Sequence, residues 1–194
     1  MIDSLALANL CEAIYKPAGE FSSIVQSGEV YAGIAHIDNQ TVIICRGSAN
    51  VADWLHDLDA VPEYIDGIGT VHAGMWDGVE EFFGKLRLSG SCVFAGHSLG
   101  CAHTAFAAAL AVRSGASVSN LELFAPPRFG DSQFHAGIAE IKTRAWRNGL
   151  DPVPEIPLGL PWTQFDLNMI YNPPQDAWDI FAWHSIDLYV RGMQ

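Results

Sequence analysis

The chain has 194 residues, of which 49% are hydrophobic and 16% are charged, and its formal net charge at pH 7 is −12. These values fit one globular domain with a sizeable buried core and argue against a disordered chain. Only 10 Lys and Arg residues stand against 22 Asp and Glu residues, which argues against a nucleic-acid partner and against purely electrostatic docking on an anionic bilayer.

The N-terminal part of the chain predicts a helix followed by a β-hairpin. Asp3 is placed as the N-cap of a helix over 3–16 whose apolar residues share one face. The turn dipeptide at 38–39 joins two segments of strand character at 30–37 and 41–45. The other expected elements, in chain order, are a short helix at 50–57, a helix at 74–88, a strand at 91–95, a helix at 99–113, a strand at 121–125, a short helix at 131–140, a strand at 142–147, a Pro-rich loop at 151–161, a strand at 164–171 and a closing helix from 185.

The alternation of strands and helices after the hairpin predicts the fold class. It is typical of an α/β fold in which a largely parallel central sheet is covered by helices on both faces. The sequence contains no repeat and no linker, so we expect a compact single domain over 1–194. In such sheets ligands bind beyond the carboxyl ends of the strands.

The N-terminal segment, the apolar segment 92–112 and the cysteines indicate where in the cell the protein is expected. The N-terminal segment lacks the basic region of a secretory signal, and the apolar segment 92–112 is interrupted by His, Ser, Thr and Gly, which disfavours a transmembrane helix. The cysteines lie in apolar segments without metal-ligand spacing and are expected to be reduced core residues: Cys11, Cys45, Cys92 and Cys101. We therefore expect a cytoplasmic protein, with export by a route that needs no cleavable signal as the alternative.

The most informative stretch is the pentapeptide at 96–100, which has the pattern Gly-x-Ser-x-Gly. It stands between an apolar strand and an Ala-rich helix, which is the setting of a nucleophile elbow in an α/β-hydrolase. A side chain at Gly96 or Gly100 would collide with the neighbouring backbone, and Ser98 would occupy the strained turn. The alternative is a Gly-rich turn with an ordinary surface serine. His97 is expected to pack beneath the nucleophile.

A serine nucleophile needs a histidine base and a carboxylate that orients it, and α/β-hydrolases carry them in the order Ser, Asp or Glu, His. Asp151 follows a predicted strand in a loop stiffened by prolines, and His184 is the single histidine after it. The alternatives are that Asp151 is a turn residue before a proline and that His184 packs beside Trp183. No histidine pair has the spacing of a zinc site, so we expect no metal.

Acyl transfer also needs donors aimed at the developing oxyanion. One is the backbone N–H of the residue after the nucleophile, Leu99, and the second comes from a loop after an early strand. The segment 46–48 is that loop, and Ser48 offers both its amide and its hydroxyl.

Seven segments together resemble the class 3 lipases, the fungal-lipase-like α/β-hydrolases, over nearly the whole chain. They occur in the family's order at 45–48, 53–58, 71–75, 96–100, 124–131, 148–157 and 183–189. The resemblance implies Ser98 as nucleophile, Asp151 as orienting acid, His184 as base, and the amides of Ser48 and Leu99 as the oxyanion hole. The family usually has a second glycine where this chain has Cys101; a small thiol is expected to fit there.

The resemblance also implies a lid after the oxyanion loop, here at 49–57. Val51, Trp54 and Leu55 would form its apolar face and contact substrate or a lipid surface transiently. The alternative is that Trp54 is a fixed core anchor.

Together these residues predict a serine carboxylic-ester hydrolase, a lipase or esterase that works through an acyl-enzyme without a cofactor. The expected substrate is a small acyl ester or lipid, and few residues suit a charged headgroup, which favours neutral short- or medium-chain esters. The alternatives are a phospholipase, thioesterase or acyltransferase with the same triad, and a non-catalytic α/β-hydrolase scaffold.

Overall fold

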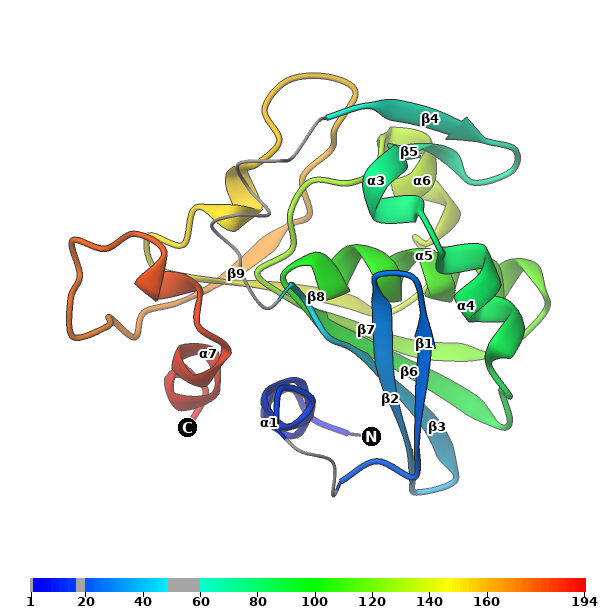
Figure 1. The fold of residues 1–194 in the computed structure, drawn as a ribbon, viewed down its shortest axis with the longest axis horizontal. Helices are drawn as coiled ribbons and strands as arrows, with labels where there is room; N and C mark the ends of the chain where they lie inside the picture. Colours follow the sequence, from blue (N-terminus) through cyan, green and yellow to red (C-terminus); the bar gives the residue numbers. More distant parts are fainter. Residues whose placement is uncertain (1, 17–19, 49–59) are drawn as a thin grey trace.

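The computed structural model describes residues 2–16, 20–48 and 60–194. Its centre is a seven-stranded sheet in the order β1-β2-β3-β6-β7-β8-β9 (Figure 1). Antiparallel pairing joins the first three strands, which are β1 (Ser23–Ser27), β2 (Val30–Ile37) and β3 (Gln40–Cys45). From β3 onward neighbouring strands are parallel, through β6 (Ser91–His97), β7 (Val118–Phe124), β8 (Thr143–Asn148) and β9 (Leu167–Ile170). The predicted largely parallel sheet is confirmed.

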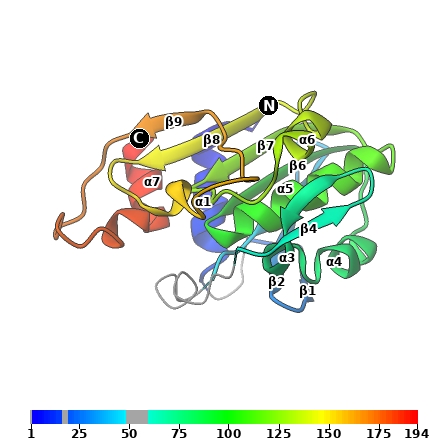
Figure 2. The ribbon, with the colours of Figure 1, turned by 90° about the horizontal axis from the view of Figure 1, so that it is seen from above.

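Helices cover both faces of this sheet (Figures 1 and 2). On one face lie α1 (Ser4–Ala13) and α7 (Ile186–Gly192), side by side although they open and close the chain. On the other face lie α3 (Ala73–Trp76), α4 (Val79–Lys85), α5 (Leu99–Arg113) and α6 (Ser132–Gly137). A separate pair of short antiparallel strands, β4 (Pro62–Ile65) and β5 (Gly69–His72), lies beside α6.

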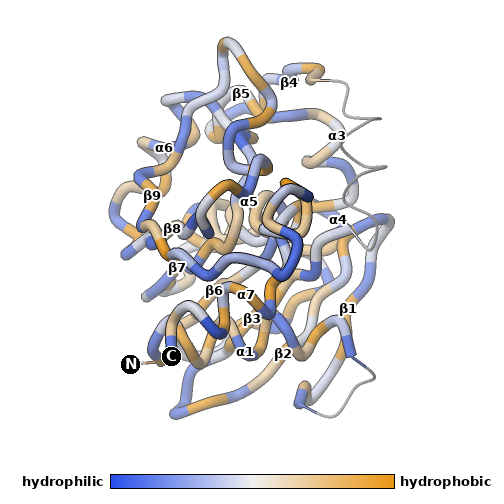
Figure 3. Tube along the Cα trace, turned by 90° about the vertical axis from the view of Figure 1, so that its left-hand side faces the viewer, coloured by the Kyte–Doolittle hydropathy of each residue, from blue (hydrophilic) through white to orange (hydrophobic). Residues whose placement is uncertain are grey.

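The central strands are apolar on both faces because helices bury both. On β3, Val42 and Ile44 belong to the core beneath α1 and α7, whereas Ile43 and Cys45 belong to the core beneath α5. Figure 3 shows the hydrophobic residues gathered along the strands between the two helical layers. A buried strand of this kind has a continuous apolar run rather than an alternating pattern.

Several expected elements have the predicted bounds. The helix at 99–113 coincides with α5, and Asp3 caps α1 by accepting a hydrogen bond from the Ala6 N–H at 2.8 Å. The turn residues Asp38 and Asn39 have φ angles of 49° and 61°, as a two-residue hairpin turn requires. The hairpin prediction is therefore confirmed.

Other expectations differ from the structure. The single helix expected at 74–88 is two helices, because Gly78 has a φ of 76° and separates α3 from α4. The strand expected at 91–95 extends to His97. Strand β1 and the β4–β5 pair were not expected; these strands are short, and β1 and β4 are mostly exposed. The helix expected at 50–57 lies outside the described residues.

Two findings concern cysteines and membranes. All four cysteines are buried and free, as their apolar neighbours predict. Among the helices in the described ranges, none is both long enough and apolar enough to cross a bilayer.

The buried His103 on α5 makes stability depend on pH. Burial lowers the pKa of this imidazole from 6.5 to about 4. Between these two values the unfolded chain holds a proton that the folded protein excludes, so stability falls as the pH drops through this window. We expect His103→Gln to flatten the pH dependence of the unfolding free energy there by up to about 1.4 kcal/mol per pH unit.

Urea unfolding of both proteins between pH 4.5 and 7 measures this effect. His36→Gln is the matched control, because it makes the same replacement at a histidine that is exposed on β2. An unchanged slope in His103→Gln would contradict the assignment to this histidine.

Candidate active site

Ser98 occupies a strained turn between β6 and α5. Its φ of 60° and ψ of −132° are rarely adopted by residues with a side chain, and holding them costs about 1–3 kcal/mol. Close packing makes the turn possible, since a Cβ on Gly96 would overlap the Gly100 carbonyl and one on Gly100 would overlap the Cys45 carbonyl. The two glycines therefore have the steric role that the pentapeptide predicts.

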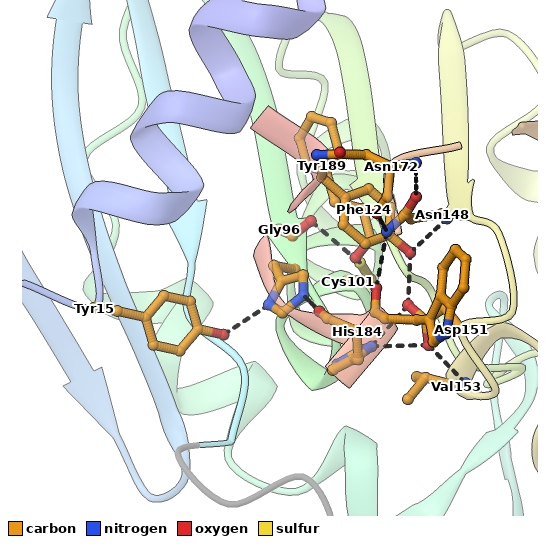
Figure 4. Close-up of polar contacts among 12 residues, drawn as sticks. Tyr15, Gly96, Cys101, Phe124, Asn148, Asp151, Val153, Asn172, His184 and Tyr189 are labelled. Carbon is orange, nitrogen blue, oxygen red and sulfur yellow. Dashed lines mark hydrogen bonds and ion pairs between the residues drawn. The ribbon is translucent and has the colours of Figure 1, made fainter. Parts of the chain in front are cut away.

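Asp151 and His184, which are 33 residues apart in the chain, form a buried hydrogen-bonded pair. Asp151 follows β8, and His184 ends the short 3₁₀ helix η2 (Ala182–His184). His184 Nδ1–H donates to the two carboxylate oxygens at 2.9 and 3.0 Å (Figure 4). With the proton on Nδ1, Nε2 has a free lone pair and can act as a base.

The two atoms that the chemistry needs are both unpaired. Ser98 Oγ and His184 Nε2 are buried and have no hydrogen-bond partner among the residues that the structure describes. A hydroxyl without a competing partner and an imidazole nitrogen with a free lone pair are what the first proton transfer of a serine hydrolase requires. They are the nucleophile and base positions expected from the sequence.

The Asp151 carboxylate is held by two further donors. The Tyr189 hydroxyl on α7 donates at 2.6 Å and the Val153 N–H donates at 3.0 Å. Burial alone would raise the pKa of Asp151, but the nearby His184 and these hydrogen bonds outweigh it, so the pKa lies below its usual value. Burial and the carboxylate raise the pKa of Tyr189 well above its usual value, so the phenol keeps its proton and is the donor.

Asn148, the last residue of β8, ties the Asp151 loop to the segment that carries His184. Its N–H donates to the Tyr189 hydroxyl at 3.0 Å. Its side-chain amide donates to the carbonyls of Asn172 and Trp183 at 3.0 and 3.2 Å (Figure 4). Sequence reasoning did not single out Asn148, Asn172 or Tyr189; it expected only a closing helix from 185 around Tyr189.

A second chain of hydrogen bonds joins the oxyanion loop to the base. Gly47 N–H lies 3.0 Å from the Tyr15 hydroxyl, which lies 2.9 Å from His97 Nδ1, and His97 Nε2 lies 2.9 Å from the His184 carbonyl. A carbonyl only accepts, so His97 Nε2 carries the proton, Nδ1 accepts from Tyr15, and the Tyr15 oxygen accepts from Gly47.

His97 also packs on the base. The two imidazole rings are 4.6 Å apart between centroids and inclined by 32°. Burial and the neighbouring His184 lower the pKa of His97 to about 3. His97 therefore stays neutral and places an uncharged ring face against His184, which is the face that an imidazolium prefers. His97 thus contacts His184 both by its ring face and by the hydrogen bond from Nε2–H to the His184 carbonyl.

We expect Tyr15→Phe to lower kcat on a dissolved ester about tenfold. This variant removes one hydrogen bond each from Gly47 and His97, and losing a buried partner costs about 1–3 kcal/mol. The ring remains, and the lost hydroxyl bonds to Gly47 and His97 rather than to substrate. We therefore expect KM to change less than twofold. Steady-state kinetics with nitrophenyl butyrate give both constants.

Tyr64→Phe is the control for this variant, since Tyr64 is an exposed tyrosine on β4. A change in KM alone for Tyr15→Phe, with kcat unaltered, would contradict a positioning role for the hydroxyl.

The expected oxyanion residues lie next to Ser98. A Cβ built on Gly47 would be 2.8 Å from the Ser98 Cβ, so the loop that carries Ser48 packs directly on the nucleophile. Leu99 opens α5, so its N–H has no acceptor within the helix, and the helix dipole favours negative charge there. Ser48 and His184 line one cavity of about 340 Å³, whose walls are Tyr15, Ser48, His97, Phe181, His184, Ser185 and Ile186.

Cys101 occupies the position where the resemblance predicts a glycine. Its thiol lies 3.2 Å from the carbonyl oxygens of Gly96 and Phe124 (Figure 4). The small side chain therefore fits between β6 and β7.

The remaining expected contacts cannot be placed. The lid at 49–57, with Val51, Trp54 and Leu55, lies outside the described residues. Within the described ranges, no group of three or more His, Cys, Asp and Glu side chains could hold a metal ion.

The fold agrees with solved structures of fungal lipases. A mutant form of MDLA from Penicillium cyclopium superposes with a TM-score of 0.68 at 23% identity, over 89% of this chain and 78% of that one. The Rhizomucor miehei triacylglyceride lipase gives 0.61 at 20% identity, over 87% and 75%. A triacylglycerol lipase from Penicillium expansum gives 0.62 at 18% identity, over 86% and 77%. At these identities the likeness shows the fold, and no curated protein matches the sequence.

The sheet order, the strained turn at Ser98 and the buried Asp151–His184 pair are those of an α/β-hydrolase. A family model described as lipase (class 3) matches residues 42–160, more than half of the chain. The chain belongs to the class 3 lipase family, and it is an ester hydrolase.

Proposed function

We propose that Ser98, His184 and Asp151 hydrolyse an uncharged carboxylic ester through an acyl-enzyme. His184 Nε2 takes the proton from Ser98 Oγ as Oγ bonds to the ester carbonyl carbon. The imidazolium then gives this proton to the departing alkoxide. In the second half of the reaction, which is hydrolysis of the acyl-enzyme, a water molecule gives a proton to Nε2 and attacks the acyl carbon. The bond between the acyl group and Ser98 Oγ then breaks, and Oγ takes the proton back from Nε2.

The backbone amides of Ser48 and Leu99 stabilise the oxyanion in both halves of this reaction. Donors of this kind each contribute about 3–4 kcal/mol when measured by their removal. No cofactor takes part in this scheme.

One observation carries the proposal. The hydrogen bond from His184 Nδ1 to Asp151 fixes the tautomer, while His184 Nε2 and Ser98 Oγ are both buried and have no partner within residues 2–16, 20–48 and 60–194. Both atoms are therefore free of competing hydrogen bonds among the described residues, as a proton transfer from Ser98 to His184 requires. A non-catalytic scaffold gains nothing from this arrangement.

The surroundings favour an uncharged substrate. Among the described residues that line the cavity next to His184 there is no Lys or Arg, and Phe181 and Ile186 contribute apolar surface. An anionic headgroup would find no cationic partner there. We therefore favour short- or medium-chain neutral esters of the lipid type over phospholipids.

Labelling with a fluorophosphonate, followed by mass spectrometry of the peptides, tests the nucleophile. The probe is expected to modify Ser98 and no other serine. A series of nitrophenyl esters of increasing chain length, run beside a triacylglycerol and a phospholipid, tests the substrate class. Absence of both labelling and hydrolysis would overturn the proposal, and faster transfer to an added alcohol than to water would assign an acyltransferase instead.

A further inference from the structure

The segment 171–181, between β9 and η2, exposes an unusual amount of apolar surface. Trp178 is 96% exposed, Phe181 is 42% exposed, and Tyr171 and Ile180 are exposed as well. In Figures 1 and 2 this orange-red loop projects beyond the rest of the fold. Exposed apolar clusters of this size mark contact surfaces.

Specific bonds hold this loop in shape. The buried Trp183 donates its indole N–H to the Ala177 carbonyl at 3.1 Å, and its ring packs on Tyr171 with 5.5 Å between centroids. The carboxylates of Asp176 and Asp179 accept hydrogen bonds from the N–H groups of Trp178 and Phe181 at 3.1 and 3.0 Å. These turns present the Trp178 ring to solvent.

The loop is continuous with the candidate active site. Phe181 lines the cavity that Ser48 and His184 also line. Tyr171 follows β9 at the carboxyl end of the strand, the same edge of the parallel sheet at which Ser98 follows β6. A surface bound by the loop would therefore lie at the mouth of this cavity.

The charge of this part of the chain decides which kind of surface the loop 171–181 can bind. Residues 148–190 contain no Lys or Arg, and the loop itself carries Asp176 and Asp179. An anionic membrane, a polyanion or a phosphorylated partner would be repelled, since binding to anionic surfaces relies on basic side chains. A surface of uncharged lipid does not repel the loop, and Trp and Tyr favour the boundary between apolar and aqueous phases.

We propose that the segment 171–181 docks the enzyme on the surface of aggregated uncharged ester lipid, with Trp178 inserted into that surface. The proposal rests on the ester hydrolase function proposed above. It assigns to Trp178 and Ile180 a contact with the lipid phase outside the cavity, next to Phe181 on the cavity wall.

Flotation with triolein droplets coated with phosphatidylcholine tests the docking without hydrolysis. The protein carries Ser98→Ala, so binding is measured whether or not the chain is catalytic. Adding Trp178→Ser is expected to weaken partition at least tenfold. Val112→Ser is the matched control, because Val112 is exposed near the end of α5 remote from Ser98, and this change is expected to alter partition less than twofold.

Two further measurements separate insertion from indirect effects. Phosphatidylcholine brominated on its acyl chains is expected to quench part of the tryptophan fluorescence of the Ser98→Ala protein, and this part is lost in Trp178→Phe. Replacing a third of the coat with phosphatidylglycerol is expected to weaken binding several-fold at low salt. Unchanged partition of the Trp178→Ser protein, or stronger binding to the anionic coat, would overturn the proposal.

A second copy of the chain is the other occupant that the apolar loop could suit. Sedimentation velocity of Ser98→Ala with and without Trp178→Ser decides between them. A monomer in both cases supports the lipid surface, whereas a dimer that Trp178→Ser dissociates would overturn it. In the catalytic protein, the ratio of rates on emulsified and dissolved ester is expected to fall at least fivefold with Trp178→Ser and to be unchanged with Val112→Ser.

Discussion

Ser98→Ala is expected to lower kcat/KM for ester hydrolysis about 10⁵- to 10⁶-fold, down to the residual rate that binding and the oxyanion amides provide. The hydroxyl is the single group at the elbow that can form the acyl bond, and His184 cannot activate what is absent. Fluorophosphonate labelling should disappear together with activity. Nitrophenyl butyrate kinetics with a sensitive fluorogenic ester for the residual rate give the magnitude.

The fold of this variant is expected to be intact. Alanine keeps the strained φ of 60° and removes one unpaired buried oxygen, so the melting temperature should be equal to or slightly above that of the unchanged protein. Ser132→Ala, at an exposed serine at the start of α6, is the control with full activity. Activity of the Ser98→Ala protein within tenfold of the control would remove Ser98 from the mechanism.

Asp151→Asn is expected to lower kcat about 10³- to 10⁴-fold with a small change in KM. Three donors converge on this carboxylate, from His184, Tyr189 and Val153. An asparagine has one acceptor oxygen and must turn its NH₂ group toward one of them. The imidazole then loses the bond that keeps its proton on Nδ1, and Nε2 no longer serves as base.

Kinetics across the pH range test this explanation. If Asp151 acts by fixing the tautomer, the variant should recover part of its rate at high pH, where hydroxide can replace the base. Asp166→Asn is the control, because Asp166 is an exposed carboxylate outside the hydrogen-bonded groups around His184. A rate for Asp151→Asn equal to that of the control would mean that the His184 contact is structural.

The elbow could be predicted because its determinants are local. Gly96, Ser98 and Gly100 lie within five residues, and the strand before them and the helix after them have their own sequence signals. The order of the triad then limited the base to His184 and pointed to Asp151. Their contact is non-local, so the hydrogen bond between them comes from the structure.

The hydrogen bonds that support His184 and Asp151 could not be predicted from the sequence. Tyr15, His97 and Gly47 come from the end of the first helix, the elbow and the oxyanion loop, and single hydrogen bonds between distant segments leave no periodic pattern. Tyr189 lies in an apolar stretch, where a tyrosine reads as a core residue. The missed strand β1 lies at the sheet edge and has little apolar alternation.

Along this chain, local chemistry is enough to set the α/β class and the Gly-x-Ser-x-Gly turn, because sterics and hydrophobic period act over a few residues, and the chain order then names Asp151 and His184 as the expected partners of Ser98. Tertiary packing alone decides how those side chains are held. The closure of α1 and α7 on one face of the sheet brings Tyr15 and Tyr189 to the two sides of the catalytic histidine region. Such contacts depend on the summed burial of both cores, which is a property of the whole fold.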